Sequence, residues 1–379
     1  MLRSLILDLK AAGHNITTLL DSRLEAFNPP IKVDKVVSIS SSNELSDNLE
    51  KFSKAVDAVY VIAPESGQTL QKLVELVETS GGLSLNSQTE AIKKTSNKMI
   101  AFQILKKRGM VIPETVMIDL DENVEGIKNL TRRLKFPLVF KPADGVGCCG
   151  LSVVRDESHM VAAVRKIAKE SLNEQFVAQE LVEGFSVSAS VISTNEKALP
   201  ITLNKQMVTL ASPDEESCYH GGIVPFNHMS KDEALEVAQK AVESIDGLRG
   251  HVGVDMVLTR NGPVVMEVNP RLTTSYIGLR EVMNLNVAQA IIDAVFRREL
   301  PESMQNVGYA FFSKVKVPPI CQMLSETWRL KEIVSPPFPI VAEEPACALL
   351  ASHSDRLENA EMAFYRAEKD LLKLCGGGD

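Results

Sequence analysis

Apolar residues recur along the chain with two different periods, and these periods predict alternating helices and strands in the first ninety residues. The segment 2–12 carries an apolar residue at every third or fourth position, which is typical of an amphipathic helix facing a core. A strand is expected at 15–21, and the continuous apolar run 57–64 is typical of a buried parallel strand. The pattern at 69–80 is helical again and is closed by a glycine pair at 81–82. This alternation predicts a doubly wound α/β region.

Beyond residue 93 the pattern changes to strands joined by short turns and covered by helices. After Pro301 it changes again, to strands punctuated by proline pairs and a final amphipathic helix. The expected elements are a helix at 95–109, a strand, glycine-rich loop and strand at 137–154, a helix at 159–171, strands at 175–184 and 186–193, a helix at 231–245, a hairpin at 251–271, a helix at 286–300, strands at 308–317 and 347–354, and a helix at 359–374.

Composition narrows the functional class. The net charge of −8 argues against a nucleic-acid binder, and the 5% of aromatic residues offers no platform for stacked bases. None of the six cysteines lies in a CxxC pair or a zinc-like spacing, so we expect reduced thiols. No signal peptide and no membrane-length apolar run is evident, so we expect a cytoplasmic protein.

The strongest local signal for chemistry is a set of oxygen ligands in the hairpin at 251–271. Glu267 and Asn269 are two positions apart on one strand and therefore point to the same face, while Asp255 lies on the partner strand. Two carboxylates and an amide on rigid strands suit Mg²⁺ bound to phosphates. The alternative is a solvated hairpin face with ordinary surface acids.

The length of the hairpin loop decides between these alternatives. A two-residue loop of Asn261 and Gly262 would pair Asp255 with Val268, on the wrong face. A three-residue loop, 260–262, would pair Asp255 with Glu267. We therefore expect an odd-length loop with Gly262 left-handed at a bulge.

Arg271 and three hydroxyl residues follow this strand. A guanidinium beside metal ligands is suited to clamp a phosphoryl group during transfer. The hydroxyls and backbone amides of Thr273, Thr274 and Ser275 are candidates for holding a substrate carboxylate. The alternative for these three is a helix N-cap.

Lys141 and the loop 144–150 form a second signal. Lys141 lies inside an apolar strand, where a cation needs an anionic partner or an exposed face. Glycines let backbone amides approach phosphate oxygens, so the loop is a candidate flap over a nucleotide, with a plain hairpin turn as the alternative. The glycines concerned are Gly145, Gly147 and Gly150.

Two weaker signals complete the candidate nucleotide site. Lys98 lies on the preceding helix and is placed to reach the α-phosphate side, unless it is an ordinary solvated lysine. In the connection after the strand at 175, the backbone of Glu180 and Val182 is suited to pair with an adenine edge. Glu183 or Ser186 is then a candidate contact to the ribose, and the alternative is a charged edge strand.

The segments 203–206 and 219–222 are the last candidates. Lys205 is expected to reach the phosphates, and Tyr219 and His220 the substrate. The glycine pair in 219–222 suggests an active-site lid between strands. The alternative for His220 is a histidine of a surface loop.

Taken in order, these residues resemble the ATP-grasp superfamily over roughly residues 90–300. The matching segments are 96–109, 113–115, 140–150, 179–184 and 253–271. The resemblance implies that Lys98 and Lys141 bind the phosphates and the adenine side of ATP, that loop 144–150 covers the phosphates, and that Arg271 stabilises the transferred γ-phosphoryl group. It also implies that Asp255, Glu267 and Asn269 hold two Mg²⁺ ions, with Mn²⁺ as a substitute.

The resemblance implies a three-lobed fold of α/β and α+β type. We expect a small doubly wound domain at 1–92, an ATP-grasp domain of two ATP-gripping subdomains at 93–300 with a hinge near 179–184, and a β-rich appendage with a final helix at 301–379. Members of the superfamily usually begin with a strand and a glycine-containing loop, whereas this chain begins at the helix, so the first strand is either truncated or lacking.

Within the superfamily, the segments 266–280, 203–206 and 219–222 are most similar to the tyramine–L-glutamate ligases of methanofuran biosynthesis. That implies an ADP-forming ligase with small-molecule partners, glutamate and tyramine, joined through an acyl phosphate. A homo-oligomer stays open. The alternatives are an ATP-grasp ligase for other amino-acid or nucleotide-precursor substrates and a nucleotide-binding regulator without turnover. Ser186 departs from the superfamily, where many members carry an acid for the ribose.

Overall fold

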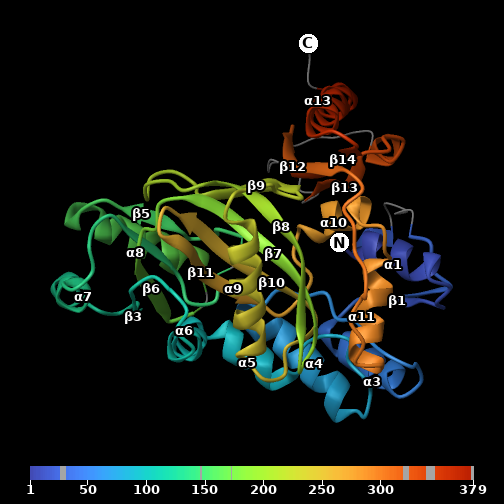
Figure 1. Cartoon of the computed structure of the whole chain (residues 1–379), viewed down its shortest axis with the longest axis horizontal. Helices are drawn as coiled ribbons and strands as arrows, with labels where there is room; N and C mark the ends of the chain where they lie inside the picture. The colour runs from blue at the N-terminus through green and yellow to red at the C-terminus, as the bar shows by residue number, and fades with distance from the viewer. Residues whose placement is uncertain (26–30, 146, 172, 319–323, 339–345, 377–379) are drawn as a thin grey trace.

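The protein is described from a computed structural model, which covers residues 1–25, 31–145, 147–171, 173–318, 324–338 and 346–376. Within these residues the strands form sheets of two, four and eight strands. Figure 1 shows the eight-stranded sheet in the middle of the view, with the four-stranded sheet on one side and the N-terminal helix α1 on the other.

The N-terminal region pairs β1 with β2 in a parallel sheet, as expected for a doubly wound pattern. The expected strand at 57–64 is wrong: only Val59 forms an isolated parallel bridge, with Ser84. Its apolar residues are still used, because Val61 packs in a small core with α3, α4 and α5. The elements are α1 (Leu2–Ala11), β1 (Thr17–Asp21), α2 (Ser22–Glu25), β2 (Lys35–Ile39), α3 (Ser42–Ser53), a 3-10 helix η1 (Ser66–Gln68), α4 (Thr69–Thr79) and α5 (Thr89–Ser96).

The four-stranded sheet is antiparallel throughout, in the order β3-β6-β4-β5. The helix α6 precedes it and is capped at its N-terminus by Asn97, whose side chain accepts a hydrogen bond from the Ile100 amide. The elements are α6 (Lys98–Lys107), β3 (Thr115–Asp119), α7 (Val124–Thr131), β4 (Leu138–Pro142), β5 (Ser152–Val154), η2 (Glu157–His159), α8 (Met160–Glu170) and β6 (Gln175–Glu180).

The eight-stranded sheet has the order β11-β10-β7-β8-β9-β12-β14-β13. The expected C-terminal appendage is thus continuous with the central sheet, because β12 pairs with β9. The elements are β7 (Phe185–Thr194), β8 (Ala198–Thr209), β9 (Cys218–Val224), α9 (Lys231–Glu243), β10 (Arg249–Thr259), β11 (Gly262–Asn269), α10 (Tyr276–Val282), α11 (Val287–Phe296), β12 (Tyr309–Val317), α12 (Leu324–Thr327), β13 (Ile333–Phe338), β14 (Ala346–Ser354) and α13 (Leu357–Leu374).

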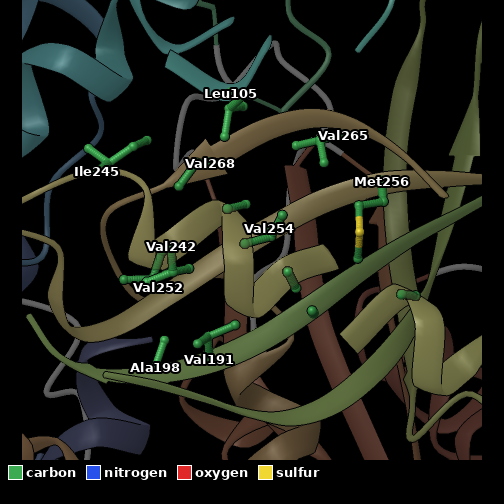
Figure 2. Close-up of a cluster of buried hydrophobic side chains, with 14 of the residues drawn as sticks. Leu105, Val191, Ala198, Val242, Ile245, Val252, Val254, Met256, Val265 and Val268 are labelled. Atoms are coloured by element: carbon green, nitrogen blue, oxygen red, sulfur yellow. The ribbon is translucent and has the colours of Figure 1, made fainter. Parts of the chain in front are cut away.

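The two faces of this sheet differ in chemistry. On β7 and β10, alternate residues such as Val191, Val252 and Val254 pack against α9, and Figure 2 shows this core. The residues between them point to the other face, where Ser188 and Ser190 lie in a polar region next to the apolar residues that cover α10 and α11. The polar part of this second face carries the candidate site.

Among the described residues, no helix is both long enough and apolar enough to cross a membrane. Cys148, Cys149, Cys218 and Cys347 are free thiols, as expected, and Cys321 lies outside the described residues.

Candidate active site

The hairpin of β10 and β11 places the candidate metal ligands on one face. Asp255 pairs directly with Glu267, as the sequence predicted. The expected three-residue loop is wrong, because Thr259 pairs with Gly262 and the loop has only two residues. The register is instead corrected at Met266, which is left unpaired in a bulge. Gly262 does adopt a positive φ of 109°.

The packing of β11 explains the bulge. Val265 and Val268 both lie in the core against α9, with exposed fractions of 0% and 3%. Residues three apart in a regular strand point to opposite faces, so both valines are buried only if an extra residue intervenes. The extra residue at Met266 also leaves Glu267 and Asn269 on the site face. Burial of the two valines thus sets the register of the candidate metal ligands.

The acid groups are held by specific partners. Asn269 Nδ2 donates to Asp255 Oδ2 at 3.1 Å, and Gln206 Nε2 donates to Asp255 Oδ1 at 2.9 Å. Lys98 Nζ lies 2.5 Å from Glu267 Oε1, and the lysine side chain is 5% exposed. Lys98 is therefore a buried cation of the site and no longer a candidate for a solvated helix lysine. The sequence analysis did not identify Gln206, although it singled out the neighbouring Lys205.

Burial and neighbouring charges together shift the pKa values of these groups. Removal from water and the neighbouring Glu267 raise the pKa of Asp255 to about 7. Burial alone would raise the pKa of Glu267, but Lys98, Lys141 and Arg271 outweigh it and lower that pKa. Burial and the neighbouring Lys98 lower the pKa of Lys141 to about 8. The site thus holds crowded charges of both signs.

This donor set fits a divalent cation that is shared with phosphate. Asp255 and Glu267 repel each other when both are ionised, and a bound cation would relieve that repulsion. Among the described residues, no three His, Cys, Asp or Glu side chains gather into a protein-only cage. Two carboxylates and one amide leave coordination positions for phosphate oxygens, as Mg²⁺ commonly requires.

Lys141 reaches the site from the other sheet. Its ammonium donates to Gln179 Oε1 at 3.2 Å, and Gln179 Nε2 donates to Thr115 Oγ1 at 2.9 Å. Gln179 is 1% exposed, so this chain of hydrogen bonds aims a partly buried lysine at the cavity.

The glycine loop lies over the same cavity, which has a volume of about 210 Å³. Gly145, Gly147 and Cys148 line it, and Val146 lies outside the described residues. The amide of Gly150 instead donates to Glu170 Oε2 at 2.6 Å. The Gly150 amide is therefore occupied by Glu170 and does not face the cavity.

Arg271 also lines the cavity and is held by an acid that the sequence analysis missed. Its Nε lies 2.6 Å from Glu65 Oε2, and one terminal nitrogen donates to the Leu272 carbonyl at 3.1 Å. Glu65 directly follows the apolar run 57–64. The segment 57–64 is not a regular strand in the structure, so the sequence pattern carried no signal that singled out Glu65.

The hydroxyls after Arg271 line the cavity and are linked to one another. Thr273 Oγ1 lies 2.8 Å from Ser275 Oγ, which lies 3.3 Å from Ser190 Oγ. Asn204 Nδ2 donates to Ser190 Oγ at 3.0 Å. Ser275 occupies the N-cap position of α10 but makes no side-chain cap hydrogen bond, so the capping alternative does not account for its hydroxyl. Thr274 lines the cavity as well.

The structure does not place Lys205 in the lining of this cavity, so its expected contact with the phosphates stays a prediction. It lies on β8 opposite Val187, on the face that packs against α9, with its Nζ 5.9 Å from the ring centre of Phe226. Side chains alternate along a strand, so Gln206 reaches Asp255 while Lys205 points away.

The expected lid is wrong, and the structure does not place His220 in the cavity lining. The segment 219–222 forms part of β9, and a side chain at Gly221 would clash with the Phe312 carbonyl of β12. The glycine pair therefore serves strand packing. His220 is exposed and lies 2.9 Å from Thr209 Oγ1, outside the cavity, whereas Tyr219 lines it.

The candidate adenine segment connects the two sheets. β6 ends at Glu180, whose amide donates to the Glu114 carbonyl at 3.1 Å and is thereby occupied. Val182, Glu183 and Ser186 lie in or next to the connection to β7, outside the 210 Å³ cavity. Their contacts to adenine and ribose stay a prediction.

Comparisons with known proteins agree with this architecture. A family model described as an ATP-grasp domain matches residues 95–275, and one described as a pre ATP-grasp 3 domain matches residues 14–92. The chain belongs to the ATP-grasp superfamily.

Curated and solved members of the superfamily cover most of this ATP-grasp chain. It is 29% identical to tyramine–L-glutamate ligase of Methanocaldococcus jannaschii over 70% of this chain and 72% of that protein. It is 27% identical to D-alanine–D-alanine ligase of Carboxydothermus hydrogenoformans over 62% of this chain and 77% of that one. The ADP complex of N5-carboxyaminoimidazole ribonucleotide synthetase has a TM-score of 0.72 at 17% identity, covering 98% of this chain and 94% of that one.

This ATP-grasp chain is an ATP-dependent carboxylate–amine ligase. Enzymes of the superfamily bind ATP, typically with Mg²⁺, which is consistent with the acids and lysines gathered in the cavity.

Proposed function

We propose that the chain activates a carboxylate of glutamate as an acyl phosphate and joins it to the amine of tyramine. The observation that carries the ligase part is a single cavity that brings together Asp255, Glu267, Lys98, Lys141 and Arg271. The substrates rest on similarity to two tyramine–L-glutamate ligases, which are 29% and 28% identical over 70% and 76% of this chain.

The residues divide the binding of ATP between them. Lys98 and Lys141 offer cations to the phosphates, with the glycine loop as a cover and the segment 179–184 as the proposed hinge and adenine contact. Asp255, Glu267 and Asn269 would hold two Mg²⁺ ions, or Mn²⁺ in their place. When bound, these ions neutralise charge on the phosphates and orient them.

Both steps balance in atoms. A carboxylate oxygen attacks the γ-phosphorus, the bond from that phosphorus to the bridging oxygen breaks, and ADP leaves. Arg271 stabilises the negative charge on the transferred group, and the hydroxyls at Thr273 and Ser275 orient the acid. The neutral amine then attacks the acyl carbon, the carbon–oxygen bond to phosphate breaks, and inorganic phosphate leaves. The nitrogen gives up one proton to solvent.

The test is ADP release from Mg-ATP with glutamate and tyramine, each alone and together, with the product read by mass spectrometry. We expect release well above background only with both substrates, and a product of the mass of their amide. Release with a different acid and amine, and none with this pair, would refute the substrates and leave the ligase class standing.

The alternatives predict different outcomes in the same assay. A ligase for another amino acid or a nucleotide precursor would respond to other members of an acid and amine panel. A nucleotide-binding regulator would bind ATP and release no ADP with any pair, but the phosphoryl clamp at Arg271 has no use in such a protein. The proposed product belongs to methanofuran biosynthesis, and we place the reaction in the cytoplasm, where ATP is supplied.

A further inference from the structure

A second cavity lies where the helix α1 meets the C-terminal strands. It has a volume of about 250 Å³, and α1, α10, α13, β14 and the start of β13 supply its walls. Figure 1 shows these elements at the end of the molecule away from the four-stranded sheet. This cavity, which we call the Arg3 cavity, shares no lining residue with the active-site cavity, and none of the steps proposed above uses it.

The lining of the Arg3 cavity combines apolar walls with charged groups. The apolar side chains are Leu7, Ile277, Ile333, Val334, Ala351 and Ala363. The ionisable side chains are the basic Arg3, Arg280 and Lys331, the acidic Glu281 and Glu332, and His353. The composition fits a small organic molecule that carries both an apolar part and a charged group.

The two acids of the lining are already engaged by basic side chains. Arg280 forms ion pairs with Glu281 and with Asp8 of α1. Lys331 Nζ lies 3.5 Å from Glu332 Oε1. These contacts neutralise the acids locally, so neither acid is left to bind a further cation.

Arg3 differs from these groups, because no acid pairs with it among the described residues. Its Nη1 donates to the Ile333 carbonyl at 3.0 Å, and its guanidinium carbon lies 4.8 Å from the ring centre of Trp328. Its Nε is buried and makes no hydrogen bond within the described part of the chain. Burial and the neighbouring Arg280 lower the pKa of Arg3, as expected for a cation without a counter-ion. An anion in the cavity would supply the missing negative charge and an acceptor.

The shape of this cation indicates the kind of anion. A guanidinium presents a planar fork of N–H donors that matches the two oxygens of a carboxylate, and stacking on Trp328 restricts the plane of the fork. One unpaired guanidinium suits a single negative charge, and the apolar walls suit a hydrocarbon body. We infer that the Arg3 cavity binds a small organic carboxylate, with the carboxylate on Arg3 and its apolar body between α1, α10 and α13. This inference does not rest on the proposed substrates.

The test uses Trp328, which is the single tryptophan of the sequence, so that tryptophan fluorescence reports on the surroundings of Arg3. The whole chain is titrated with hexanoate, with the uncharged hexanamide and with inorganic phosphate. We expect hexanoate to change the emission and to bind about tenfold or more tightly than the other two, as for a charge-assisted hydrogen bond combined with an apolar body. Hexanoate should also raise the temperature of unfolding, because a ligand of the native state stabilises it.

Two variants change the Arg3 cavity in different ways. Arg3→Gln removes the charge but keeps hydrogen-bond donors, and should reduce the preference for hexanoate over hexanamide to less than about twofold. Ala363→Leu adds volume to the apolar wall without changing a charge, and should weaken hexanoate by about tenfold or more. The matched control is Arg23→Gln, since Arg23 is an exposed arginine that pairs with Asp21 and does not line the Arg3 cavity. It should leave both affinities unchanged.

The outcomes separate a carboxylate site from the alternatives. Equal affinities for hexanoate and hexanamide in the wild type, or an unchanged preference in Arg3→Gln, would overturn the inference. Phosphate binding as tight as that of hexanoate would show that the apolar walls contribute nothing and would overturn the choice of an organic carboxylate. If Arg3→Gln does not fold, the comparison of the three ligands in the wild type and the effect of Ala363→Leu decide the question. Binding of hexanoate that raises the unfolding temperature equally in the wild type and in Ala363→Leu would place it elsewhere and contradict the site.

Discussion

At the scale of single residues, the site balances buried charge. Lys98 is almost fully buried against Glu267, and Asp255 stands between two amide donors. Each charge depends on its neighbours, because an unpaired charge in such surroundings is expensive. Substituting one member should therefore affect both catalysis and the groups around it.

Glu267→Gln should lower kcat by about a hundredfold or more, equivalent to about 2.7 kcal/mol in the barrier, while the protein stays folded. The amide supplies no negative charge for Mg²⁺ and leaves Lys98 without its ionic partner. The measurement is ADP release at saturating substrates, with circular dichroism to confirm the fold.

The matched control is Glu50→Gln. Glu50 is an exposed acid of α3 that pairs with Lys54 at 2.7 Å. Neither residue lines the active-site cavity. This substitution should leave kcat unchanged. A Glu267→Gln enzyme with near-normal kcat would overturn the metal assignment.

At the scale of elements, strand irregularity and loop composition decide the shape of the site. The bulge at Met266 lets β11 bury two valines and still present its ligands. The glycine loop follows β4, the strand that carries Lys141, and leads to β5. Near its end, the Gly150 amide donates to Glu170. One end of the loop thus faces the proposed nucleotide and the other is tied to α8.

We expect the loop 144–150 to be mobile without nucleotide and to become ordered when ATP binds, because glycines lower the cost of movement. Hydrogen exchange at the amides of 147–151 should slow when Mg²⁺ and a non-hydrolysable ATP analogue are added.

The helix α8 provides the internal control, since its amides should exchange at the same rate in both states. Equal protection of the loop with and without the analogue would argue against a flap.

At the scale of the whole molecule, the N-terminal helix α1 is joined to α10, the helix that follows β11. Asp8 of α1 accepts from the Tyr276 hydroxyl at 2.5 Å and from Arg280 at 2.6 Å, and both donors belong to α10. Since α10 begins directly after Thr273, Thr274 and Ser275, these contacts let α1 hold the helix that follows the cavity hydroxyls.

Asp8→Ala should lower the free energy of unfolding by about 3 kcal/mol, because removing one partner leaves the partly buried Arg280 without its main counter-ion. Urea denaturation at neutral pH measures the change.

Lys10→Ala is the matched control on the same helix. Lys10 forms an exposed ion pair with Asp34, with side chains 32% and 45% exposed, and its loss should cost less than about 1 kcal/mol. Equal losses for both variants would contradict a role for Asp8 in joining α1 to α10.

The sequence by itself determined features that depend on near neighbours. The cap at Asn97 and most helices and strands follow from local periodicity and hydrogen bonding. The pairing of Asp255 with Glu267 was predicted from alternation, although through the wrong loop length. The period-two alternation of strand residues also placed Glu267 and Asn269 on one face, and both side chains line the active-site cavity.

Tertiary structure decided the rest, because it depends on partners distant in the chain. Burial against α9 placed the bulge at Met266, and it also turned Lys205 away from the site that its neighbour Gln206 enters. The expected strand at 57–64 is only partly buried, with Val61 in the core and Ile62 39% exposed, and it found almost no strand partner. Glu65 became part of the site only because that segment packs beside Arg271, about two hundred positions later in the chain, a proximity that no local pattern encodes.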